Sequence, residues 1–235
     1  MGWNQNLSFR EKSITTQTFV DEGNPDDPPS APIKTTITVV TYKFTQAAAH
    51  LLSITTGISE ADIQKVGIRK TGGSLMPTYD PNKGGGAITF PGNDANSYRM
   101  NLTDNFFDNS YGANGYKDDV MEWLDLTSHE VGHIKDIQEI GGGKAKYFRT
   151  FISEYANAGS HDGNPREQRA DIGRNEFRSF VSFVNSYYGK DKVKALFENS
   201  KNTDKEIIGR IDQWWKQYQK QKEADNKAAE EKKKE

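Results

Sequence analysis

Apolar and polar residues alternate in several short segments before residue 103, with the period expected of β-strands. The clearest segment spans residues 34–44 (KTTITVVTYKF), where Ile37 and Val39 alternate with threonines. Residues 21–32 (DEGNPDDPPSAP) are rich in turn-forming residues and predict a connector. Further strands are predicted at residues 13–20, 66–70, 87–90 and 97–102, and short helices at 46–55 and from Ser59 onward.

After residue 116 the apolar positions recur at steps of three, four and seven, which is typical of helices packed against a core. Residues 116–138 show this spacing, and the glycines at 141–143 supply backbone that can end such a helix. Helices are also predicted at residues 144–157 and 165–188, and from a capping sequence at Thr203 through Tyr218. Strands followed by helices predict the α+β class.

The two ends of the chain differ from its centre. Residues 1–33 predict an extended N-terminal segment or linker. Residues 219–235 consist of charged residues, Ala, Gln and Asn, without an apolar face, so we expect a solvated helical extension or a disordered tail there. One domain is therefore predicted over residues 34–218.

Composition excludes several classes of function. A net charge of −2 and a pI of about 6.1 give no general affinity for nucleic acid or anionic membranes. Neither a run of 18 apolar residues nor a signal peptide is present, so we expect a soluble protein, cytoplasmic or secreted by a non-Sec route. The absence of cysteine excludes disulfides, Cys-based zinc sites and cysteine nucleophiles.

The sequence His129-Glu130-Val131-Gly132-His133 carries the chemistry. Residues four apart lie on one face of a helix, so both imidazoles can reach one ion, and neutral imidazole is a good ligand for Zn²⁺. The carboxylate of Glu130 can then take a proton from water next to the metal. The spacing therefore predicts a zinc site within the helix over residues 116–138.

Tetrahedral zinc needs a third protein ligand, and two glutamates are the main candidates. Glu154 lies on the helix over residues 144–157, and Glu167 lies in the first turn of the next helix. Glu167 is favoured because Asp171 follows it by four residues and can accept a hydrogen bond from a ligating imidazole, whereas Ala158 follows Glu154. His161 and a site completed by water alone stay open as further alternatives.

HEVGH followed by Glu167-Gln168-Arg169-Ala170-Asp171 resembles the zincin metallopeptidases of the gluzincin type. A metzincin would have Gly and His where this chain has Asp136 and Glu139. The resemblance covers about residues 87–190. It implies that His129, His133 and Glu167 bind zinc, that Glu130 is the general base, and that Asp171 supports a histidine ligand. It also implies a small mixed sheet on the active-site helix, followed by a helical half.

The implied reaction is hydrolysis of a peptide bond in a peptide or protein substrate. His161 is the first candidate to assist Glu130 by donating to the developing oxyanion, and Tyr155 is the second. We expect the substrate to add as a strand to a free sheet edge, which residues 87–90 or 99–102 would supply.

Two other interpretations of the motif stay open. The chain could be a catalytically inactive zinc-binding interaction domain, or HEVGH could be coincidental in a structural domain. In its lack of cysteine and its turn-rich N-terminus the chain is similar to metallopeptidase effector and toxin domains of bacterial polymorphic toxins. That similarity implies an immunity protein or a larger parent polypeptide as partner.

Overall fold

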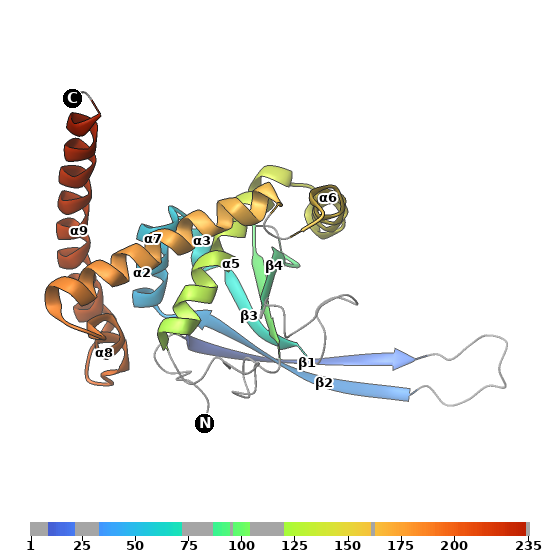
Figure 1. Ribbon diagram of the computed structural model, residues 1–235. Helices are drawn as coiled ribbons and strands as arrows, with labels where there is room; N and C mark the ends of the chain where they lie inside the picture. The colour runs from blue at the N-terminus through green and yellow to red at the C-terminus, as the bar shows by residue number, and fades with distance from the viewer. Residues whose placement is uncertain are drawn as a thin grey trace, which may run out of the picture.

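The computed structural model describes residues 9–21, 33–71, 87–94, 96–103, 120–160 and 163–233, and side chains of residues 41–69, 87–94, 96–102, 120–160 and 163–233. A mixed sheet and a larger helical part build the molecule (Figure 1), which confirms the predicted α+β class. The strands are β1 (Phe9–Asp21), β2 (Ile33–Phe44), β3 (Val66–Thr71), β4 (Ala87–Pro91) and β5 (Tyr98–Thr103). The helices are α2 (Gln46–Thr56), α3 (Glu60–Ile63), α5 (Val120–Ile140), α6 (Gly143–Ala158), α7 (Pro165–Tyr188), α8 (Lys192–Glu198) and α9 (Asp204–Lys232).

The sheet has the strand order β1-β2-β3-β5-β4. β3 and β5 are parallel and all other neighbouring pairs are antiparallel, so the sheet is mixed, as expected. Among the described strands, β4 lies at an edge of the sheet, whereas β5 lies between β3 and β4. Two segments were predicted to offer a free edge. The prediction for residues 99–102 is wrong, and residues 87–90 hold the edge position.

Helix α5 lies between the sheet and α7, and α6 lies beside β4 (Figure 1). Apolar side chains of α5 face the sheet, and the Phe44 and Trp123 rings meet there with their centroids 5.5 Å apart. Helix α2 is buried on most sides and contacts α5, α7 and α9. Its start is capped by Thr45 and by Asp204, whose carboxylate accepts a hydrogen bond from the Gln46 N–H.

The predicted helix ends are mostly confirmed. α7 has the predicted bounds, and α5 ends at Ile140 before three glycines that all have positive φ. The capping box at Thr203 forms with Glu206, but α9 continues to Lys232, so the chain adopts a helical extension beyond residue 218. Helix α8 was not predicted, because it is a single short helix with two buried side chains. Residues 9–21 of the predicted N-terminal segment form β1, paired with β2.

No helix among the described residues is both long and apolar enough to cross a bilayer. The domain limits at residues 34 and 218 stay predictions.

The contact between α5 and α7 is unusually close at one point. A Cβ on Gly132 would lie 2.7 Å from the Ala170 Cα, and Ala170 is fully buried. Two small residues thus let the backbones of the two helices approach. Gly132 is a glycine because nothing larger fits between the helices.

Gly132→Ala is expected to destabilise the protein by about 1–3 kcal/mol, because the added methyl group overlaps the backbone of α7. Urea unfolding measures the change. Gly209→Ala in α9 is the matched control: no atom lies within 4 Å of the added Cβ, so this substitution should stabilise by about 0.5–1 kcal/mol. Equal stability of Gly132→Ala and the wild type would contradict the close packing.

Candidate metal centre

His129 and His133 project from one face of α5 into the interior. Both are 5% exposed, and their rings lie 5.0 Å apart between centroids at an interplanar angle of 84°. The helix spacing of four residues accounts for this arrangement, because successive turns place the two side chains one above the other. The two imidazoles therefore face a common region beside α7.

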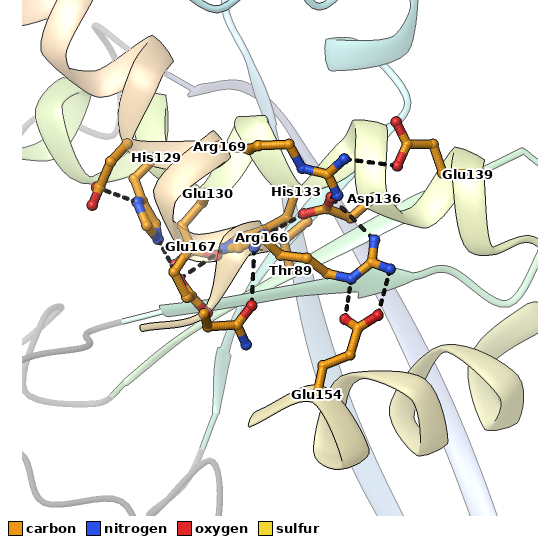
Figure 2. Close-up of polar contacts among 12 residues, drawn as sticks. Thr89, His129, Glu130, His133, Asp136, Glu139, Glu154, Arg166, Glu167 and Arg169 are labelled. Atoms are coloured by element: carbon orange, nitrogen blue, oxygen red, sulfur yellow. Dashed lines mark hydrogen bonds and ion pairs between the residues drawn. The ribbon is translucent and has the colours of Figure 1, made fainter. Parts of the chain in front are cut away.

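Glu167 reaches the same region from the first turn of α7. Its Oε2 lies 3.1 Å from His129 Nε2 and 3.4 Å from His133 Nε2 (Figure 2). Tetrahedral ligands at zinc bond lengths are about 3.3 Å apart, so these spacings match those of a shared ion. Among the described residues, His129, His133 and Glu167 are the group whose ligand atoms could hold a metal. Glu167, the residue that the sequence favoured as third ligand, thus places its carboxylate between the two imidazoles.

Each histidine directs its other ring nitrogen to a carboxylate. His129 Nδ1 donates to Asp171 Oδ1 at 2.8 Å, the partner expected from the sequence. His133 Nδ1 donates to Asp136 Oδ2 at 3.1 Å. An acceptor at Nδ1 fixes the tautomer that leaves Nε2 to bind a metal. Sequence reasoning missed Asp136, although its position three residues after His133 on the same helix face was an available signal.

Glu130 is buried beside the histidines and is held by the sheet. The Thr89 hydroxyl of β4 donates to Glu130 Oε2 at 2.7 Å, and Thr89 is 1% exposed. Tyr147 of α6 in turn donates from its hydroxyl to the Thr89 carbonyl oxygen at 3.2 Å. Burial raises the pKa of Tyr147, so this hydroxyl stays a neutral donor. Thr89 and Tyr147 are remote in sequence from the motif, and no spacing rule indicated them.

The electrostatics around His133 favour positive charge. Burial by itself lowers the pKa of His133, but hydrogen bonds to Asp136 and Glu167 outweigh it and raise the pKa to about 10. The surrounding carboxylates are therefore arranged to stabilise positive charge at this point. A divalent cation can supply that charge once the imidazole proton is released.

The alternative ligand Glu154 has a different partner. Its carboxylate forms a forked pair with the Arg166 guanidinium, with Oε1 2.8 Å from Nη2, and Arg166 holds the pKa of Glu154 below its usual range. Tyr155, the second candidate oxyanion donor, is half-buried and packs on Phe151 with ring centroids 5.3 Å apart. His161, the first candidate, lies outside the described residues.

The donor set suits zinc. Two imidazole nitrogens and one carboxylate oxygen converge, both imidazoles have a carboxylate at the second nitrogen, and a carboxylate that is not a ligand lies next to them. The chain has no thiolate that would favour a closed structural site. The residues present therefore fit a catalytic-type zinc site.

The chain matches no protein-family model, and neither curated proteins nor solved structures show a detectable similarity to it. The interpretation of the centre therefore depends on its geometry.

Glu167→Ala should weaken zinc binding by more than the 10–100-fold typical of losing an outer hydrogen-bond partner, because it removes one of three ligands. Competition with a chromophoric chelator measures the affinity. Glu154→Ala removes a carboxylate of the same kind from the neighbouring helix, where it contacts Arg166 and no ligand candidate, so its loss of zinc affinity should be much smaller than that of Glu167→Ala. Equal losses in the two variants would remove Glu167 as the third ligand.

Proposed function

We propose that this protein is a zinc-dependent metallopeptidase that hydrolyses peptide bonds. The observation that carries the proposal is the convergence of His129 Nε2, His133 Nε2 and Glu167 Oε2, at 3.1 and 3.4 Å, beside the buried carboxylate of Glu130. The residues come from α5 and α7, so secondary structure rather than a loop supplies all of them.

The bound zinc, Glu130 and Thr89 have separate roles in the proposed reaction. Zinc bound at this centre supplies Lewis acidity that polarises an amide carbonyl and makes water more acidic. Glu130 accepts the proton of the attacking water and returns it to the leaving amine. The Thr89 hydroxyl donates a hydrogen bond to Oε2 of Glu130 and so restrains the orientation of the carboxylate. The remaining lone pairs of this carboxylate can accept the proton.

A catalytic role explains Glu130 better than a structural one. A closed structural zinc site has four protein ligands and no use for a further buried carboxylate. Among the residues that the structure describes, the ligand group contains three, and Glu130 lies 5% exposed on the helix that carries the two histidines. Keeping such a group buried is costly unless it has a function or a partner charge.

The proposal extends to a zincin-like arrangement. A small mixed sheet packs on the helix that carries the histidines, the third ligand follows on a later helix, and an edge strand borders the site. The edge position of β4 next to Glu130 supports binding of an extended peptide along that strand, which the sequence also predicted.

Glu130→Gln is expected to retain zinc and to lose about 10²–10⁴-fold in the rate of peptide cleavage, because the amide cannot accept a proton. Metal content by mass spectrometry and cleavage of a denatured-protein or peptide library measure the two effects. Glu122→Gln makes the same change at an exposed position of α5 and should leave both properties unchanged.

Comparable cleavage by wild type and Glu130→Gln would remove Glu130 as the base. A wild type that binds zinc tightly and cleaves nothing in the library would favour the alternative of an inactive zinc-binding interaction domain.

A further inference from the structure

Two clusters of ion pairs join α5 to α7, one on each side of the HEVGH segment. In the first, Asp125 of α5 pairs with Arg174 and Arg178 of α7, at 2.7 and 2.5 Å. In the second, Asp136 of α5 pairs with Arg166, at 3.2 Å, and with Arg169. Each cluster contains one aspartate and two arginines, so the two are closely matched in composition.

The second cluster differs from the first because its aspartate contacts a metal-ligand candidate. Asp136 uses Oδ2 to accept from His133 Nδ1, and it uses Oδ1 to accept from both guanidinium groups (Figure 2). Asp125, by contrast, lies one turn before His129. Its carboxylate accepts from the two arginines of α7, and its backbone carbonyl oxygen accepts from the Ser128 hydroxyl. The Asp136 side chain is 2% exposed, so no room is left for solvent to orient it.

Each arginine of the second cluster also pairs with a carboxylate other than that of Asp136. Arg166 forms the forked pair with Glu154 of α6, and Arg169 donates to Glu139 of α5 at 3.0 Å. A guanidinium fixed at two sites has one orientation, because its planar fork cannot satisfy both partners otherwise. Arg166 and Arg169 also flank Glu167 in the sequence, so the turn that supplies the third ligand also supplies this contact.

We propose that Arg166 and Arg169 are positioning residues that hold Asp136 in the orientation that directs Nε2 of His133 to the metal. The inference deepens the proposed function and rests on its metal centre, but it does not require peptide cleavage. The two guanidinium groups fix one oxygen of Asp136, and the other oxygen then fixes the imidazole. A change in the position of either arginine is therefore expected to change the orientation of the His133 imidazole, although no ligand residue is altered.

The test compares Arg166→Gln/Arg169→Gln with the matched control Arg174→Gln/Arg178→Gln in the full chain. Zinc affinity, the visible absorption spectrum of the cobalt(II)-substituted protein, and thermal stability are measured for both. We expect the first variant to bind zinc about 10–100-fold more weakly and to show altered cobalt bands. The control loses the corresponding arginine–aspartate pairs between the same helices and should lose stability while keeping its zinc affinity and cobalt spectrum.

A double-mutant cycle with Asp136→Asn identifies the route of the effect. If the arginines act through Asp136, the triple variant should bind zinc as weakly as Asp136→Asn alone. Arg166→Lys/Arg169→Lys keeps both positive charges but lacks the planar guanidinium groups, so it should recover only part of the zinc affinity lost in Arg166→Gln/Arg169→Gln.

Equal zinc affinities for Arg166→Gln/Arg169→Gln and its control would overturn the proposal. Additive losses of zinc affinity in the double-mutant cycle would overturn it as well. Failure of the wild type to bind zinc at all would overturn both this inference and the proposed function. A wild type that binds zinc but cleaves no peptide would refute only the proposed function, and the difference in affinity between the two double variants would still support the positioning role.

Discussion

The close approach of α5 and α7 allows the side chains of the candidate metal centre to meet. Gly132 and Ala170 bring the two backbones together at the point where the histidines of one helix must meet the glutamate of the other. A carboxylate side chain is short, so Glu167 reaches both imidazoles only if its helix lies this near. The small residues therefore determine whether three ligand atoms can share one ion.

Much of this arrangement follows from residue spacing within single helices. The separation of His129 and His133, and of Glu167 and Asp171, is fixed by helix geometry, so the sequence indicated these pairs and favoured Glu167 over Glu154. Apolar periodicity likewise predicted α7 and most of the strands. These features are local, and local rules describe them well.

The contacts that sequence reasoning missed join distant parts of the chain. Thr89 is 41 residues from Glu130, and Arg166 is 30 residues from Asp136, so neither pair has a spacing that a single sequence could reveal. Asp136 was noticed only as a departure from the metzincin pattern. In the structure, the Asp136 carboxylate accepts a hydrogen bond from the second histidine, His133.

Helix α6 covers the free edge of the sheet at one backbone position. The Tyr147 hydroxyl donates to the Thr89 carbonyl oxygen, on the strand that lies at the edge of the sheet among the described residues. Exposed strand edges promote unwanted pairing between chains, and a side-chain hydroxyl at the edge blocks it. Because of the same bond, any chain that paired with β4 at this position would have to displace the Tyr147 hydroxyl, so access to the strand is linked to the position of α6.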